Sequence, residues 1–180
     1  MNKIEIQNVV ATAALGTKID LNAIMKVFRN VEYRPKKFPG LVFRLKRPKT
    51  ATLIFTTGKM VCTGSKSAKL AQRAVKKVVK ELRGAGFIIK DEPSVEIQNI
   101  VASADISSKV DLEGAADILG NMMYEPEQFP GAVYRMDEPK VVILVFASGK
   151  LVITGAKSEE QVIIAADKIR AILMENELLF

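Results

Sequence analysis

The sequence predicts an α+β fold in which one small domain occurs twice. Two observations support this. Similar segments recur along the chain at a constant offset of 91 residues. Within each copy, runs rich in β-branched residues are separated by turn residues and combined with two stretches of helical spacing. Apolar residues make up 48% of the chain and charged residues 26%, a balance typical of a globular protein.

The repeat covers almost the whole chain. Residues 6–11 (IQNVVA) return as residues 97–102 (IQNIVA), and Phe38-Pro39-Gly40 returns as Phe129-Pro130-Gly131. Residues 4–89 align with residues 95–180 without a gap, and 32 of the 86 pairs are identical. A period of this length indicates a duplicated domain, so we predict one repeat over residues 1–91 and another over 92–180.

The strands of the first repeat are predicted from apolar, β-branched runs that end at turn residues. The first covers residues 4–13, and a short second strand at residues 31–34 ends before Pro35. Three more strands are expected at residues 41–45, 51–55 and 59–63, separated by Pro48 and by Thr57-Gly58.

Two helices complete each repeat. Asp20 is a good N-cap for a helix over residues 21–28. A longer helix is expected over residues 67–82, with Ala71, Val75, Val78 and Leu82 on its apolar side and Gly84 and Gly86 ending it. In the second repeat, Ser158 and Gln161 have the spacing of a capping box.

One face of the predicted sheet lacks a cover. Residues 53–55 and 141–146 are apolar at both odd and even positions, although two helices per repeat cover a single face. Either the sheet is buried on both sides, or an apolar face of considerable size is an interaction surface.

A few polar residues interrupt these apolar strands at equivalent places. They are Asn8 and Asn99, with Thr63 and Thr154. One such asparagine could simply bond the local backbone. A symmetric pair beside Val10 and Val101 suggests a mostly dry surface with a few donors. The minor groove of A·T-rich DNA is a matching target, because it offers adenine N3 and thymine O2 as acceptors.

The composition excludes several classes of function. The chain has no histidine and a single cysteine, Cys62, so zinc, haem and other metal or cofactor sites are not expected. We find no nucleophile–base pair and no phosphate-binding glycine loop, which argues against an enzyme. No apolar run is long enough for a membrane span or a signal peptide, and the lone cysteine favours a reducing compartment.

The net charge of +7 is unevenly divided. Residues 1–91 hold 20 Lys and Arg against 5 Asp and Glu, a net +15, and residues 92–180 hold 7 against 15, a net −8. The densest basic cluster lies along the long first-repeat helix, at residues 66–83. It would suit a protein partner or flanking DNA, or it is a solvated face that aids solubility.

The repeated motifs resemble those of the TATA-box-binding protein family, in the short form of archaea. The motifs are residues 6–11, Tyr33-x-Pro35-x-x-Phe38-Pro39-Gly40, Arg44-x-x-x-Pro48-Lys49, Phe55-x-x-Gly58-Lys59 and Thr63-Gly64-x-Lys66-Ser67, each with a second-repeat counterpart. The resemblance implies a saddle-shaped domain, with a curved ten-stranded antiparallel sheet and four helices on its convex side. This family is itself the established example of minor-groove binding with a kink of about 80° and apolar wedges, so those properties come with the resemblance.

The resemblance also implies roles for individual residues. The DNA-kinking phenylalanines correspond to Phe38, Phe55, Phe129 and Phe146. Asn8, Asn99, Thr63 and Thr154 correspond to the central groove contacts. The apolar floor corresponds to Val10, Leu53, Val61, Val101, Leu144 and Val152, and positions near phosphates to Arg44, Lys59, Arg135 and Lys150.

The implied function is initiation of transcription at A·T-rich promoters. In the family, the loop that holds Glu125 and Glu127 contacts transcription factor B, which links the protein to RNA polymerase. Arg34 and Lys36 replace these acidic residues in the first repeat. The expected location is the cytoplasm, in the archaeal nucleoid, and a homodimer would shield the apolar face in the absence of DNA. The alternative is a single-stranded nucleic-acid binder that uses the sheet as a stacking platform, but aromatic residues are only 6% of the chain.

Overall fold

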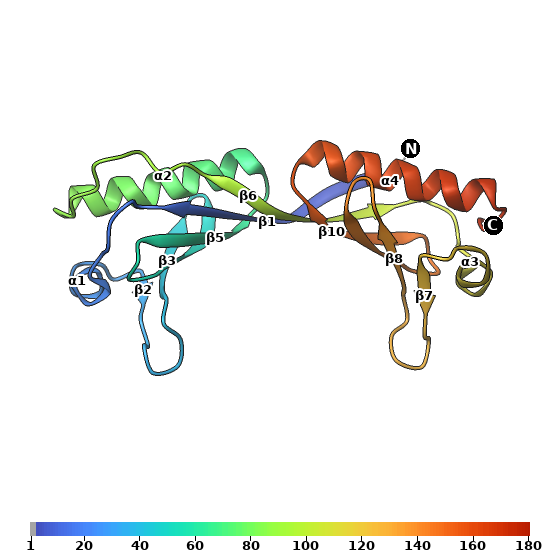
Figure 1. The fold of residues 1–180 in the computed structure, drawn as a ribbon, viewed down its shortest axis with the longest axis horizontal. Coiled ribbons are helices and arrows are strands. Elements are labelled where there is room, and N and C mark those ends of the chain that lie inside the picture. The colour runs from blue at the N-terminus through green and yellow to red at the C-terminus, as the bar shows by residue number, and fades with distance from the viewer. Residues whose placement is uncertain (1–2) are drawn as a thin grey trace. The chain divides into compact units, whose positions relative to one another are not determined.

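The computed structural model describes residues 3–180. Their ten strands form one antiparallel sheet with the order β2-β3-β4-β5-β1-β6-β10-β9-β8-β7, and four helices complete the fold (Figure 1). In chain order the elements are β1 (Lys3–Ala14), α1 (Leu21–Val27), β2 (Val31–Glu32), β3 (Leu41–Lys46), β4 (Lys49–Ile54), β5 (Lys59–Ser65), α2 (Ala68–Gly84), β6 (Glu96–Asp105), α3 (Leu112–Ile118), β7 (Met122–Tyr124), β8 (Ala132–Met136), β9 (Val141–Val145), β10 (Lys150–Ala156) and α4 (Glu159–Glu175). The predicted α+β class is confirmed.

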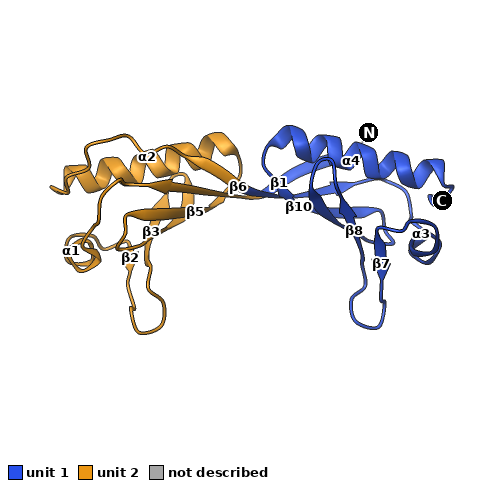
Figure 2. Cartoon of the chain, viewed as in Figure 1, with its two compact units in different colours: residues 1–7, 99–180 blue, residues 8–98 orange. Residues whose placement is uncertain are grey.

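The chain folds into two compact units (Figure 2). One unit is Asn8–Gln98, and the other is Asn99–Phe180 together with the N-terminal segment up to Gln7. Each unit therefore includes a strand end from the other repeat. Gln7 Nε2 donates to Ser103 Oγ at 2.9 Å in one unit, and Gln98 Nε2 donates to Thr12 Oγ1 at 2.9 Å in the other. The division at residues 91 and 92 remains a prediction about the repeats.

Each unit has its core between one face of the sheet and the helices. In the unit Asn8–Gln98, the strand residues Val9, Ala11, Phe43, Ile54 and Met60 are fully buried, as are the helix residues Ala71, Ala74, Val75, Val78 and Leu82. Their strand neighbours Leu53 and Val61 are only half-buried. The helices thus cover a single face, and the alternative of a sheet buried on both sides is wrong.

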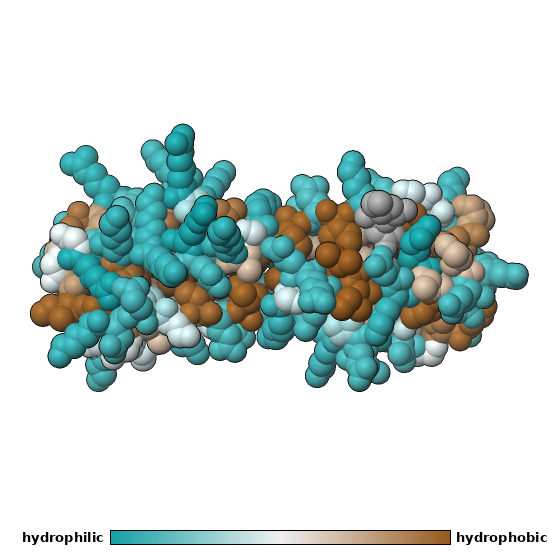
Figure 3. Space-filling model, turned by 90° about the horizontal axis from the view of Figure 1, so that it is seen from above, coloured by the Kyte–Doolittle hydropathy of each residue, from teal (hydrophilic) through white to brown (hydrophobic). Residues whose placement is uncertain are grey.

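The helices begin where the sequence predicts. Asp20 and Asp111 cap α1 and α3, and Ser67 Oγ accepts from Leu70 N–H at 3.0 Å at the start of α2. At α4, Ser158 Oγ accepts from Gln161 N–H at 3.2 Å, and Gln161 Oε1 accepts from Lys157 N–H at 2.8 Å. The predicted capping box therefore forms in a shifted version. Its second bond comes from Lys157 N–H, one residue before the N-cap Ser158. Both long helices turn their other side to solvent, where α2 is covered by hydrophilic side chains (Figure 3).

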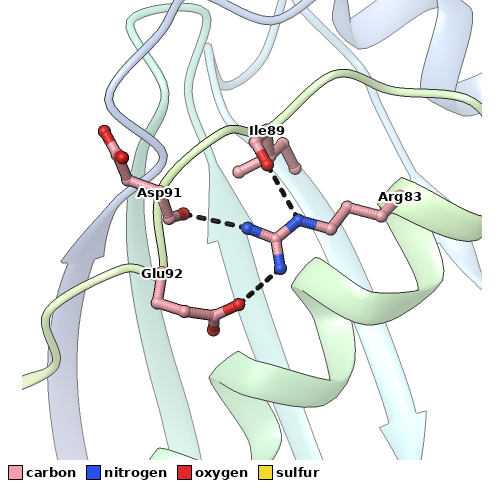
Figure 4. Close-up of polar contacts among 4 residues, drawn as sticks. All are labelled: Arg83, Ile89, Asp91 and Glu92. Atoms are coloured by element: carbon pink, nitrogen blue, oxygen red, sulfur yellow. Dashed lines mark hydrogen bonds and ion pairs between the residues drawn. The ribbon is translucent and has the colours of Figure 1, made fainter.

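Arg83 fixes the chain that leaves α2 (Figure 4). Its Nε donates to Ile89 O at 2.9 Å, Nη2 donates to Asp91 O at 3.0 Å, and Nη1 lies 2.5 Å from Glu92 Oε1. Because all three guanidinium nitrogens are engaged, Arg83 serves the fold, although the sequence groups it with the basic surface of this helix.

Most element boundaries of the first repeat differ from the predictions by one or two residues, and two of these differences have a visible cause. The second strand stops at Glu32 and does not reach residue 34, because Lys37 and Phe38 both donate backbone N–H groups to Arg34 O and close a turn there. The long helix continues to Gly84, with Ala85 as its C-cap, before Gly86 with φ +97°.

Candidate nucleic-acid interface

The face of the sheet opposite the helices, here called the outer face, carries an apolar strip in the unit Asn8–Gln98. Strand register places Val42 opposite Leu53 and Leu53 opposite Val61, so the three side chains lie in a row across β3, β4 and β5. On β1 the residue opposite Val61 is Thr12, and Val10 lies two residues before it on the same strand. Val42, Leu53, Val61 and Val10 are half-buried, and the sequence analysis had singled out three of them.

The second-repeat strip repeats this arrangement. Val133 pairs with Leu144, and Leu144 pairs with Val152, across β8, β9 and β10. These residues and Val101 are half-buried, like their counterparts. A hollow of about 750 Å³ lies beside the strip, with Ser103, Phe146 and Val152 in its lining.

Sequence reasoning missed Val42 and Val133, which complete these rows. Residues 41–45 are apolar at four of five positions, so their pattern does not say which side faces the core. The strand register supplies that information, because it aligns each valine with a leucine already assigned to the uncovered face.

A pair of phenylalanines stands on the outer face of each unit. The rings of Phe38 and Phe55 are 5.9 Å apart at an interplanar angle of 64°, and those of Phe129 and Phe146 are 5.8 Å apart at 61°. Phe38 is 43% exposed and Phe129 41% exposed. Large apolar side chains this open do not contribute fully to a core, so both pairs are available to a ligand.

A glycine lies beneath each pair and leaves room for the rings. A Cβ on Gly40 would lie 2.7 Å from Phe38 Cε2 and 3.0 Å from Phe55 Cε1. On Gly131 it would lie 2.9 Å from Phe129 Cε2 and 3.0 Å from Phe146 Cε1. The recurring Phe-Pro-Gly motif therefore positions both rings of each pair.

The loops that carry Phe38 and Phe129 are held alike. Phe38 N–H donates to Arg34 O, and Phe129 N–H donates to Glu125 O, both at 3.0 Å. In each unit the loop projects away from the long helix, α2 or α4 (Figure 1). The phenylalanines thus stand on the side of the sheet that the helices leave open.

Asn8 is oriented by its neighbours on β5. Gly64 N–H donates to Asn8 Oδ1 at 2.7 Å, and Asn8 Nδ2 donates to Thr63 Oγ1 at 3.1 Å. The local bond to the backbone therefore exists, but it uses only the oxygen. An amide nitrogen carries two hydrogens, so a second donor remains for a ligand.

Asn99 has the same arrangement on β10. Gly155 N–H donates to Asn99 Oδ1 at 2.6 Å, and Asn99 Nδ2 donates to Thr154 Oγ1 at 3.3 Å. The strand pairing is irregular beside both sites, between Val9 and Ala11 and between Ile153 and Ala156. Gly64 and Gly155 have φ of +100° and +98°, a conformation that glycine adopts without strain.

The four basic residues predicted near phosphates are all exposed. Arg44 Nη2 lies 3.5 Å from Glu32 Oε2, whereas Met123 occupies the position of Glu32 beside Arg135. A hollow of about 450 Å³ is lined by Arg44 with Lys49 and Lys66, two cations that the sequence analysis had not selected. The Pro-Lys and Thr-Gly-x-Lys motifs that contain these lysines recur in the second repeat, and this recurrence could have identified both residues from the sequence.

The acidic loop residues also lie at the surface. Glu125 and Glu127 are exposed between β7 and β8, and Arg34 and Lys36 are exposed at the equivalent places between β2 and β3. Arg34 Nε lies 3.2 Å from Glu32 Oε1. The two loops have similar backbone turns and opposite charges, so a protein partner can tell them apart.

The described residues include no exposed cysteine and no group of side chains suited to hold a metal ion. Burial raises the pKa of the Cys62 thiol, which makes it a poor nucleophile. Within residues 3–180, no three His, Cys, Asp or Glu side chains are grouped to hold a metal ion. No helix there has the length and apolar character needed to cross a membrane.

Comparison with known proteins gives a consistent result. The family described as "Transcription factor TFIID (or TATA-binding protein, TBP)" matches residues 3–85 and 94–176. TATA-box-binding protein of Archaeoglobus fulgidus is 54% identical over 169 residues, covering 93% of this chain and 92% of that protein. That of Pyrodictium occultum is 57% identical over 164 residues, covering 91% of this chain and 82% of that protein.

A solved structure agrees with these relatives. Methanococcus jannaschii TBP superimposes with a TM-score of 0.88 at 49% sequence identity, over 96% of this chain and 99% of that chain. The resemblance inferred from the motifs is confirmed.

Proposed function

Because the chain belongs to the TATA-binding protein family of transcription factors, we propose that it binds and bends the minor groove of A·T-rich promoter DNA with the outer face of its sheet. In this role it initiates transcription and recruits transcription factor B, and through it RNA polymerase. Membership of the family also confirms that the chain is not an enzyme. The observation that carries the proposal is the apolar outer face with one oriented asparagine in each unit.

The apolar strips select a target with few competing polar groups. Half-buried valines and leucines lose little on contact with the sugar edges of a minor groove, and they gain from the removal of apolar surface from water. Asn8 and Asn99 each have a donor left for adenine N3 or thymine O2. A guanine amino group would face the apolar side chains without a partner, which disfavours G·C pairs.

The phenylalanine pairs supply the wedges for bending. Each pair is positioned by the contact between its rings and by the glycine beneath, and its exposed member can enter a base step. Unstacking a step costs a few kcal/mol, which the additional contact with bent DNA offsets. Flexible steps such as TA reduce the cost and add to the preference for A·T-rich sites.

The exposed cations set the register along the duplex. Arg44, Lys59, Arg135 and Lys150 would contact phosphates, with Lys49 and Lys66 beside Arg44. Because much of the contact is apolar, only part of the affinity should fall with salt.

The loop with Glu125 and Glu127 is proposed to contact transcription factor B. Exposed carboxylates would repel DNA, so their natural partner is a basic protein surface. The cations at Arg34 and Lys36 make the first-repeat loop unsuitable for the same surface. The difference would orient the partner on a nearly symmetric complex.

A bending-sensitive gel-shift assay tests the proposal. The probes are an A·T-rich TATA duplex, a scrambled duplex and the single TATA strand. We expect tight binding and a retarded, bent complex with the TATA duplex alone. Equal affinity for all three probes would contradict duplex recognition, and a preference for the single strand would favour the stacking-platform alternative.

A further inference from the structure

The solvent side of α2 carries a row of cations that the DNA-binding proposal does not use. Four exposed residues form this row, here called the α2 stripe: Lys69, Arg73, Lys76 and Lys80. At 100° per residue they lie within about 60° of the helix circumference, and at 1.5 Å per residue they extend for about 16 Å along it. None of the four takes part in an ion pair among the described residues, so their charges are available to a ligand.

No acidic residue of α2 interrupts the stripe. The single carboxylate of this helix, Glu81, lies about 120° around the axis from Lys69, and its Oε2 is buried. Two further cations of the helix are engaged in the fold, because Lys77 Nζ donates to Arg47 O at 2.8 Å and Arg83 holds the chain that follows. Figure 3 shows the hydrophilic surface that results over α2.

The second repeat shows that the fold does not need these cations. At the aligned positions α4 has acidic or apolar residues, namely Glu160, Ile164, Asp167 and Ala171. Nevertheless α4 packs on β10 as α2 packs on β5, and both helices bury a row of alanine, valine, leucine or isoleucine against the sheet. The cations of the stripe are therefore additional to what packing requires.

The stripe also works against the helix that carries it. Lys69 lies in the first turn, which has no acidic residue, and the partial positive charge of a helix N-terminus disfavours a cation there. The first turn of α4 has two acidic residues instead. Arg73 follows Lys69 by four residues, and Lys80 follows Lys76 by four, a spacing at which like charges destabilise a helix. A charge pattern that folding disfavours points to a ligand that compensates for it.

The side chains around the stripe indicate the class of this ligand. Every exposed residue of α2 is lysine, arginine, glutamine or glycine, so the surface offers no apolar anchor for the core of a protein interface. A phosphate backbone needs no such anchor, because cations alone can hold it. One strand of a duplex has a phosphate at about every 3.4 Å of the helix axis, so the stripe spans the axial length of about five phosphates.

We propose that the α2 stripe binds the phosphate backbone of a second segment of duplex DNA, without regard to its sequence. Because α2 packs on the covered face of β3, β4 and β5, the stripe lies on the opposite side of the sheet from the outer face. The two surfaces therefore hold different duplex segments, and one chain can bridge them. The second site does not depend on which ligand the outer face binds.

A bridging assay tests the proposal. A TATA duplex is immobilised on beads and saturated with the full chain, and a labelled G·C-rich duplex of equal length is added. The beads should retain the labelled duplex only when the chain is present, and retention should fall steeply with salt, because each phosphate contact releases counterions. Loading of the chain on the TATA duplex is measured separately, so a failure of TATA binding is recognised as such. A loaded chain that retains no labelled duplex would overturn the proposal.

Two variants with the same loss of charge locate the second site, and they are compared as free chains with the G·C-rich duplex by anisotropy. The stripe variant is Lys69→Gln with Arg73→Gln, Lys76→Gln and Lys80→Gln. The control replaces four other exposed cations by glutamine: Lys18, Lys26, Arg29 and Lys90.

The stripe variant should lose at least about tenfold in affinity, and its slope of log affinity against log salt should fall by about three to four. The control should change affinity less than about threefold, and the affinity of both variants for the TATA duplex should stay within about threefold of the unaltered chain. Equal losses of G·C-duplex affinity in the two variants would show that net charge, and not the stripe, holds the DNA.

An acidic peptide distinguishes DNA from a protein partner. A glutamate-rich helical peptide with as many charges as the duplex competes with the labelled duplex for the full chain. The peptide should bind at least about tenfold more weakly, because the phosphates of a duplex are more densely spaced and release condensed counterions. Equal or tighter binding of the peptide would overturn the proposal and make the stripe a site for an acidic protein.

Discussion

The two repeats are alike on the outer face of the sheet and different on the helices and loops. The phenylalanine pairs agree to 0.1 Å in ring separation, at 5.9 and 5.8 Å, and both asparagines bond one threonine and one glycine. By contrast, α2 is basic where α4 is apolar and acidic, and Arg34 and Lys36 stand where the second repeat has Glu125 and Glu127. We propose that this contrast reflects two kinds of ligand: DNA, with two similar halves, on the outer face of the sheet, and a protein partner that distinguishes the repeats at the loops.

The largest expected effect comes from removing the asparagine donors. Asn8→Asp keeps an acceptor for Gly64 N–H but replaces the free donor with a carboxylate that faces groove acceptors. We expect the affinity for a TATA duplex to fall at least about 100-fold, because a charged group is left unpaired at the interface. Titration by anisotropy measures this. Asn99→Asp should reduce the affinity by the same factor to within about threefold. A larger difference between the two variants would show that the outer faces of the two units do not contribute equally to DNA binding.

Exchanging the loop charges is the next largest test. Glu125→Arg with Glu127→Lys, the residues of the first repeat, should weaken the ternary complex with transcription factor B about tenfold or more and leave DNA affinity nearly intact. The matched control, Arg34→Glu with Lys36→Glu, should have little effect on that complex. Native gels with DNA and purified transcription factor B measure both. Loss of DNA binding in the first variant would show that this loop contacts DNA.

A smaller effect is expected when the support of a phenylalanine pair is changed. A Cβ in Gly131→Ala would displace the rings of Phe129 and Phe146, which are free to move because they lie at the surface. DNA bending should decrease and affinity fall severalfold, with a change in unfolding free energy of about 1 kcal/mol or less. Gly40→Ala is the partner variant, and bending that survives both changes would argue that the exact placement of the rings is unimportant.

The smallest predicted effect concerns Arg83. Arg83→Met introduces the residue that α4 has at this position and removes two bonds to backbone carbonyls and one ion pair. We expect a loss of about 1 kcal/mol in unfolding free energy, measured by urea titration, without a change in DNA affinity. A DNA-binding defect would mean that Arg83 does more than hold the chain after α2.

Much of this architecture could be predicted from the sequence, because the duplication shows which residues recur. The recurring Phe-Pro-Gly and Phe-x-x-Gly-Lys motifs marked the four phenylalanines, whose proposed wedge role comes with the family resemblance, and the Thr-Gly motif marked the neighbours of the asparagines. Val42 and Val133 were missed, since apolar residues on both sides of a strand do not reveal its register. Arg83 was grouped with the basic surface, because its carbonyl partners lie in a loop whose path the sequence pattern does not specify.

The central claim is that the outer face binds duplex DNA and that the phenylalanine pairs bend it. It is tested most directly by the bend angle of a TATA duplex, measured by fluorescence energy transfer between end labels. The two variants compared with the unaltered chain are Phe38→Ala with Phe55→Ala, and Phe129→Ala with Phe146→Ala. We expect each variant to reduce the bend by a similar amount. An unchanged bend in both would contradict it and make the four phenylalanines structural.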